Sequence, residues 1–252
     1  MDAPECFRKA TTWQTVGNVL FWANVAVSFS LIFAKNTKFE NILSIPLGAM
    51  VVTSLLVSLR SRYLINDGNA TLRTVQIADA LGAASEHPIR EGYYNSSLAP
   101  GFRRLLATTC ESAGLTKVIL EEMFTGHLFK MAVFAVVFVA YVSYAKADAS
   151  ILAVSAQALF SAELLGGLVC LQRYLRKVRG VEQALVQFFR TASDINDPEA
   201  LAIGIASHVD YECAKEESAI LLDSRIFRKL NPRYSEKWNR LRAEFKIDSQ
   251  TS

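Results

Sequence analysis

The sequence has few of the residues that build disulfide frameworks and metal centres. It contains four cysteines and three histidines among 252 residues. No two cysteines have the CxxC spacing of zinc and redox motifs, and no histidine clusters with them along the chain. We therefore expect neither a disulfide framework nor a metal site, and no cofactor.

Signatures of catalysis and of nucleotide binding are also missing. The sequence has no HExxH, no GxSxG, no P-loop and no Rossmann glycine pattern. It has no convincing strand pattern of alternating apolar and polar residues. A net charge of +3, spread along the chain, is too small to indicate binding to duplex nucleic acid. These absences predict an all-α protein that is not an enzyme.

The chain does have long apolar segments, and 51% of its residues are hydrophobic. Four segments are long enough to cross a bilayer as helices of about 20 residues. They are Val16–Ala34, Ile42–Leu59, Leu128–Ala145 and Ile151–Leu171. Short loops join the first two and the last two, which predicts an integral membrane protein with two transmembrane hairpins. The expected divisions are a first hairpin at 1–59, a cytoplasmic helical segment at 60–127, a second hairpin at 128–171 and a cytoplasmic helical region at 172–252.

Lysines and arginines near the spans predict the orientation. Nine lie on the side that carries both termini and three on the other side. Because positive residues that flank spans stay in the cytoplasm, we expect both termini there, in a multi-pass protein of the inner (plasma) membrane. A cleaved signal peptide is the rival interpretation of residues 1–34, but the apolar segment is too long and no A-x-A-like site follows it.

A basic cluster follows the last span directly. Its members are Arg173, Arg176, Lys177 and Arg179. Next to a span, such a cluster is expected to set the topology and to meet anionic lipid. Its charge also suits an anionic ligand, which is the second interpretation.

One carboxylate lies inside the last apolar segment. Glu163 would be near the middle of the bilayer, where a charge costs about 2.5 kcal/mol or more, so it is expected to face protein or water. In one interpretation it bonds to Asn24 or Ser28 of the first span within a helix bundle. In the other, Glu163 and Gln157 line a water-filled path through an assembly of several copies, as acidic rings do in cation channels. Small residues beside it predict close helix packing: Ala158, Ala162 and Gly166.

The polar regions predict further helices. Residues 101–124 have apolar side chains at helical spacing and no proline, so one long helix is expected to continue into the third span. Apolar steps of three and four over Leu171–Phe188 are typical of a coiled-coil seam and predict pairing with another copy. A capped helix is expected over Asp197–Lys229, ended by Asn231-Pro232, and Ser235 is expected to cap a short amphipathic helix.

A loop between the hairpins has side chains suited to a nucleotide. The sequence REGYYN contains Arg90, Tyr93, Tyr94 and Asn95, residue types that hold phosphate and stack on bases. The same stretch also fits a plain connector between helices.

The order of these elements resembles that of a group of bacterial proteins. The most similar stretches are REGYYNSSLAPGFRRL at 90–105 and LLDSRIFRKLNPRYSEKWNRL at 221–241. The chain is similar to the predicted pore-forming effectors of antiphage systems, four-transmembrane and related two-transmembrane families associated with nucleotide second-messenger synthases. The resemblance implies a homo-oligomeric pore that breaches the inner membrane when a nucleotide second messenger, a partner protein or stress triggers it. The alternative is a non-conducting membrane scaffold or sensor whose cytoplasmic helices bind a partner.

Overall fold

The computed structural model describes residues 2–33, 39–83, 98–144, 165–191, 197–245 and 247. All regular elements in these ranges are helices, so the all-α prediction is confirmed. The helices are α1 (Ala3–Phe33), α2 (Phe39–Leu81), α3 (Phe102–Tyr144), α5 (Gly167–Thr191), α6 (Pro198–Ser218) and α7 (Ser224–Glu244).

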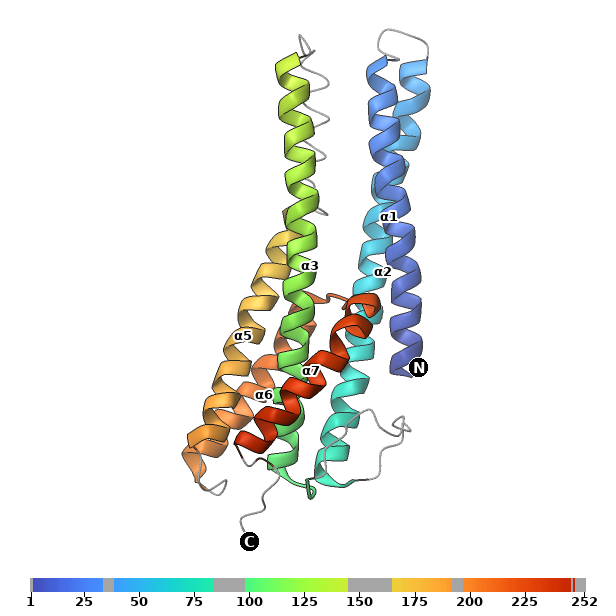
Figure 1. Ribbon diagram of the computed structural model, residues 1–252. Coiled ribbons are helices and arrows are strands. Elements are labelled where there is room, and N and C mark those ends of the chain that lie inside the picture. The colour runs from blue at the N-terminus through green and yellow to red at the C-terminus, as the bar shows by residue number, and fades with distance from the viewer. Residues whose placement is uncertain are drawn as a thin grey trace.

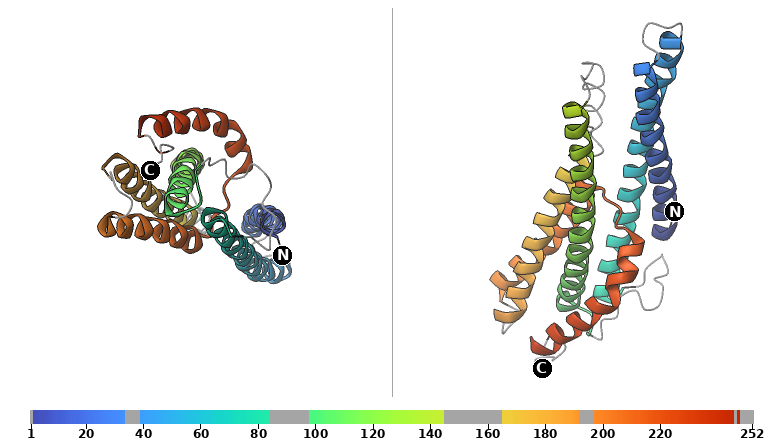
Figure 2. Two further views of the ribbon diagram at one scale, coloured as in Figure 1. Left: turned by 90° about the horizontal axis from the view of Figure 1, so that it is seen from below. Right: turned by 45° about the horizontal axis from the view of Figure 1, so that its top comes forward.

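The helices form two parts of unequal thickness (Figure 1). At one end α5, α6 and α7 surround the first half of α3, and the second half of α2 lies beside them; we call this part the base. At the other end α1, the first half of α2 and the second half of α3 extend well beyond it, and we call these the projecting helices. In the end-on view of Figure 2, α2 lies between α1 and α3.

Two helices run through both parts without a break. α2 and α3 each have 43 residues, which corresponds to about 65 Å at 1.5 Å per residue. The helix predicted from residue 101 into the third span is therefore confirmed as α3. The expected divisions at 59/60 and at 127/128 fall inside these continuous helices.

Among the described residues, one helical stretch is long and apolar enough, by length and composition, to cross a bilayer. It is Gly48–Leu81, and 22% of its most apolar 18-residue segment is buried. Most of the predicted fourth span lies outside the described residues. The four-span arrangement therefore stays a prediction.

The hydrophobic core fills the base between α3, α5, α6 and α7. Leu106 and Leu120 of α3 meet Val178 and Leu185 of α5 there, all four fully buried. Ile247 joins the same core, and its carbonyl oxygen accepts a hydrogen bond from Nε of Arg103 at 3.0 Å. These contacts join the start of α3 to a residue that follows α7.

The seam on α5 is buried within a single chain. Its buried members are Leu171, Tyr174, Val178, Val181, Leu185 and Phe188, and the helices packed against α5 are α3 and α6. The pattern thus identifies the buried face of α5 correctly. The prediction that this seam pairs with another copy is wrong. The base of the same chain already supplies the partner helices.

The end of α6 also differs from expectation. Its start is as predicted, because Asp197 accepts a hydrogen bond from the backbone N–H of Glu199 at 3.2 Å. The helix ends at Ser218, where Ala219 adopts a left-handed conformation with φ of 44°. Asp223 then caps α7 by accepting from the N–H of Arg225 at 2.8 Å.

Pro232 lies inside α7 and does not end a helix. The prediction that Asn231-Pro232 is a stop and that Ser235 caps a new helix is therefore wrong. Proline in a helix interior removes one backbone hydrogen bond and usually kinks the helix. α7 follows a curved path over the base in Figure 2, and Tyr234 and Trp238, both beyond the proline, are its buried anchors.

Glycines allow the closest helix contacts in the base. A Cβ atom at Gly114 of α3 would lie 2.0 Å from the hydroxyl oxygen of Tyr234, and one at Gly204 of α6 would lie 2.4 Å from a methyl carbon of Leu106. Neither distance is compatible with the present packing. The absence of a side chain at Gly114 is therefore what lets the Tyr234 ring of α7 pack onto α3.

We expect Gly114→Ala to destabilise the protein, because the added methyl group displaces Tyr234. Overpacking of this kind costs about 1–3 kcal/mol. The control is Gly126→Ala on the same helix, where a Cβ meets no atom within 4 Å and where the better helix propensity of alanine stabilises by up to about 1 kcal/mol. Thermal unfolding in detergent micelles measures both. Equal shifts in the two variants would contradict the packing described.

Candidate functional site: a polar junction between the two parts

The α1–α2 pair meets the base through contacts that are mainly polar. Among the described residues, the main core contains no residue of α1 or α2. A small second cluster packs Ala10, Leu64 and Ile65 of the pair against Ala219 and Leu221. Further contacts are made by a group of polar side chains that we call the polar junction, which consists of Arg73, Gln76 and Asp79 of α2, Arg104 and Thr109 of α3, and His208 and Glu216 of α6.

Thr109 is the centre of this junction and is fully buried. Its hydroxyl donates to the carbonyl oxygen of Leu105 at 2.8 Å and accepts from the side-chain amide of Gln76 at 3.3 Å. Its oxygen also lies 2.9 Å from Nδ1 of His208. One side chain thereby joins α2, α3 and α6.

The contact between Thr109 and His208 depends on the tautomer of the ring. The hydroxyl has a single proton; when it is donated to Leu105, Nδ1 of His208 donates to Thr109 and Nε2 is an unprotonated acceptor in the neutral ring. Nε2 is buried and has no hydrogen-bond partner among the described residues.

Burial lowers the pKa of His208 below its usual value, because the charged ring is poorly solvated there. Glu212 opposes this effect, and Lys215 and Arg73 add to it. Both oxygens of Glu212 already accept from the ammonium group of Lys215, at 2.9 and 3.0 Å. The junction thus favours neutral histidine, and a proton on Nε2 would gain no acceptor.

Two ion pairs flank the buried part of the junction. Arg104 holds Asp79 by two bonds, from Nη2 at 2.7 Å and from Nε at 3.1 Å. Arg73 contacts Glu216 at 2.6 Å. A paired guanidinium and carboxylate fit each other in one orientation. These pairs therefore fix the register of α2 against α3 and α6.

The predicted basic cluster forms ion pairs within the base. Arg173 and Lys177 both contact Glu217, at 3.3 and 2.8 Å, and Arg179 contacts Glu121 at 2.9 Å. Arg176 is exposed. Three of these four charges therefore also link α5 to α6 and α3, a role that the sequence did not suggest.

Most residues of the other predicted sites lie outside the described residues. These are Glu163, Gln157, Ala158, Ala162, Arg90, Tyr93, Tyr94 and Asn95. Asn24 is partly buried in α1, Ser28 belongs to the same helix, and Gly166 is partly buried before α5. The contact between Glu163 and Asn24 or Ser28 stays a prediction.

Metal or thiol chemistry has little support in the described part of the chain. No cluster of three or more His, Cys, Asp or Glu side chains there could hold a metal ion. The four cysteines are free. Burial raises the pKa of Cys110 to about 12, so its thiol stays protonated and unreactive near neutral pH.

Comparison with known proteins finds no matching family model, no match among curated proteins and no match among solved structures.

We expect the stability of the protein to fall as the pH is lowered from 7 to 5. The pKa of His208 is lower in the folded chain than its usual 6.5, so below that pH the unfolded chain takes up a proton that the folded chain does not, at up to about 1.4 kcal/mol per pH unit. His208→Asn keeps a donor near Thr109 and removes the titration. Unfolding midpoints of the variant should therefore fall less steeply over this range. Parallel profiles for the two proteins would exclude His208 as the cause.

Proposed function

We propose that the protein is a multi-pass membrane protein that assembles into a pore, with the projecting helices in the bilayer and the base in the cytoplasm. The observation that carries the membrane location is the exposed apolar surface of the predicted spans. Eleven large apolar side chains within the predicted spans are each more than half exposed. They are Val19, Trp22, Val52, Leu55, Leu56, Leu59, Leu128, Phe129, Val136, Val139 and Val169.

Such a surface has different consequences in water and in lipid. Each large apolar side chain left in water forgoes about 1.5–3 kcal/mol of burial energy, and a continuous patch of them marks an interaction surface. Helices satisfy their own backbone hydrogen bonds, so they can lie in hydrocarbon. The base, in contrast, has a buried core and many surface ion pairs, as expected for a part in water.

A link between the base and the spans favours a pore over a passive anchor. α2 and α3 run from the polar junction into the projecting part without interruption. A change in the contacts of Thr109 or Arg104 would therefore tilt or shift the spans of α2 and α3 relative to each other. Motions of rigid helices against one another are a common means of switching. The resemblance in element order supports a role in antiphage defence, in which opening the pore halts growth of the infected cell.

Within the pore, we assign Glu163 and Gln157 to the water-filled path. A carboxylate near mid-membrane is costly in lipid and is typical of ion paths. Because the α5 seam is occupied within one chain, we place the contacts between copies on the projecting helices. The alternative of a non-conducting scaffold is favoured by no specific contact.

The membrane location predicts opposite outcomes for two similar substitutions. Val136 of α3 is 68% exposed and Val209 of α6 is 50% exposed, but only Val136 lies in a proposed span. Val136→Asp should reduce membrane integration, because aspartate at the centre of a span costs about 2.5–3.5 kcal/mol. Val209→Asp should be tolerated in water. The measurement is the fraction of protein that resists carbonate extraction from membranes. Equal retention of both variants in the membrane would contradict the location.

The pore itself is tested by ion flux from liposomes that contain the purified protein. We expect cation flux from the natural protein and reduced flux from Glu163→Gln, which keeps the size and removes the charge. Glu163→Leu should fold and stay closed, because a hydrophobic constriction excludes water. A scaffold would pass no ions under any condition. Unaltered ion selectivity in Glu163→Gln would contradict the assignment of Glu163 to the water-filled path.

A further inference from the structure

The last described helix carries an unusual share of the positive charge. α7 has seven lysines and arginines and two glutamates, in a chain whose net charge is only +3. The rest of the chain is therefore slightly acidic. α7 is therefore a place to look for a site that binds an anion.

Several of these cations already have partners. Arg225 contacts Asp223 at 3.0 Å, and Lys229 contacts Glu122 at 3.1 Å. In contrast, three others make no hydrogen bond or ion pair with any residue that the structure describes: Arg233, Lys237 and Arg240. Their spacing of four and three residues places them on one face of the helix.

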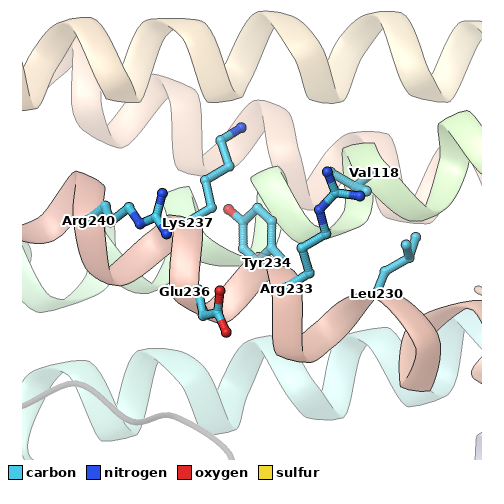
Figure 3. A pocket seen from close by; sticks show the side chains of 7 residues that line it. All are labelled: Val118, Leu230, Arg233, Tyr234, Glu236, Lys237 and Arg240. Carbon is cyan, nitrogen blue, oxygen red and sulfur yellow. The ribbon is translucent and has the colours of Figure 1, made fainter.

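These three side chains line a cavity of about 380 Å³ between α7 and α3. Val118 and Leu230 give it an apolar wall, and Tyr234 and Glu236 complete the lining. Figure 3 shows Arg233 and Lys237 leaving α7 on the same side, near Tyr234, and Glu236 directed away from Lys237. Tyr234 is buried against Gly114, so it holds this stretch of α7 firmly on α3.

The chemistry of the lining selects phosphate. Two guanidinium groups supply planar pairs of donors that match phosphate oxygens, and the lysine adds a point charge. The cavity also has the size of a small-molecule site, for which about 300–1,000 Å³ is usual. The apolar side chains of Val118 and Leu230 suit the ring of a ligand.

The position of the cavity favours a soluble ligand over a lipid headgroup, a step that rests on the proposed membrane location. Val118 lies ten residues before Leu128, the first residue of the proposed third span, or about 15 Å along the helix. The headgroup layer on each side of the hydrocarbon is about 5–8 Å thick. A lipid phosphate would therefore not reach Arg233, and Lys237 and Arg240 lie further along α7 from its start near the spans.

We propose that the cavity between α7 and α3 binds a soluble phosphorylated small molecule of nucleotide size, held by Arg233, Lys237 and Arg240. The bound anion offsets the repulsion among the three cations and stabilises α7 in its position on α3. The loop before α7 contacts the α1–α2 pair, since Ala219 and Leu221 pack with Leu64 and Ile65. A ligand in the cavity would therefore affect the contacts between the α1–α2 pair and the base, to which the polar junction also belongs.

Binding of tripolyphosphate and of adenosine triphosphate to the full chain in neutral-lipid nanodiscs tests this site. We expect saturable binding of adenosine triphosphate, and Arg233→Gln/Lys237→Gln should weaken it at least about tenfold, because two charge-assisted contacts are lost. The matched control is Arg225→Gln/Arg228→Gln, which removes the same charge from the same helix outside the cavity. Its affinity should change less than about twofold. Similar losses in both double variants, or no saturable binding of either probe, would overturn the proposal.

A second arm separates the sources of phosphate. Nanodiscs with anionic lipid should leave the affinity for the soluble probes within about threefold of that in neutral discs at 150 mM salt, where surface fields are screened within about 8 Å. Loss of probe binding in anionic discs would identify a lipid headgroup as the occupant and would overturn the soluble ligand. Binding requires no conductance, so a protein that binds the probe but passes no ions refutes the pore and leaves the site intact.

Discussion

The arrangement of the α1–α2 pair against the base depends on one buried hydroxyl group. The side chain of Thr109 has a single proton and two lone pairs, and its three contacts reach its own helix, α2 and α6. A single hydrogen bond contributes only about 1 kcal/mol net, yet a buried polar group left without its partner costs about 1–3 kcal/mol. The junction is therefore either fully formed or distinctly unfavourable. That property suits a connection that has two states.

The α1–α2 pair and the base each have more extensive internal packing than the contacts between them. α1 packs along α2, and the base has a continuous apolar core. The contacts between them include one small apolar cluster, the Thr109 contacts, the ion pairs of Arg104 and Arg73, and a backbone bond from the N–H of Gly101 to the carbonyl oxygen of Ala80 at 2.7 Å. Regions with few buried apolar contacts separate at lower free energy than the cores on either side. We therefore expect the boundary between the α1–α2 pair and the base to open more readily than the core of the base.

Helical periodicity predicted the helices well and their partners poorly. It identified α3 as one continuous helix and the buried face of α5, because spacing shows which side of a helix is apolar. It could not show that α3 and α6 of the same chain cover that face. The junction gave no local signal, since Thr109 is 33 residues from Gln76 and 99 from His208. The residue that ends α6 in a left-handed conformation is alanine, so no glycine marks this break in the sequence, and a proline within a helical pattern usually predicts a stop. A stop at Pro232 places Arg233 outside the helix that contains Lys237 and Arg240, so the sequence does not indicate that these three residues share one helical face.

The position of Ile247 in the core bears on the order in which the protein is made. Synthesis produces α1 and α2 first, and these two helices pack along each other. The base cannot complete its core until Ile247 has left the ribosome and reached the start of α3, where Arg103 binds its carbonyl group. The α1–α2 hairpin is thus complete while the base that it contacts is still unfinished. A chain interrupted before Ile247 would lack the bond that joins the end of the chain to the start of α3.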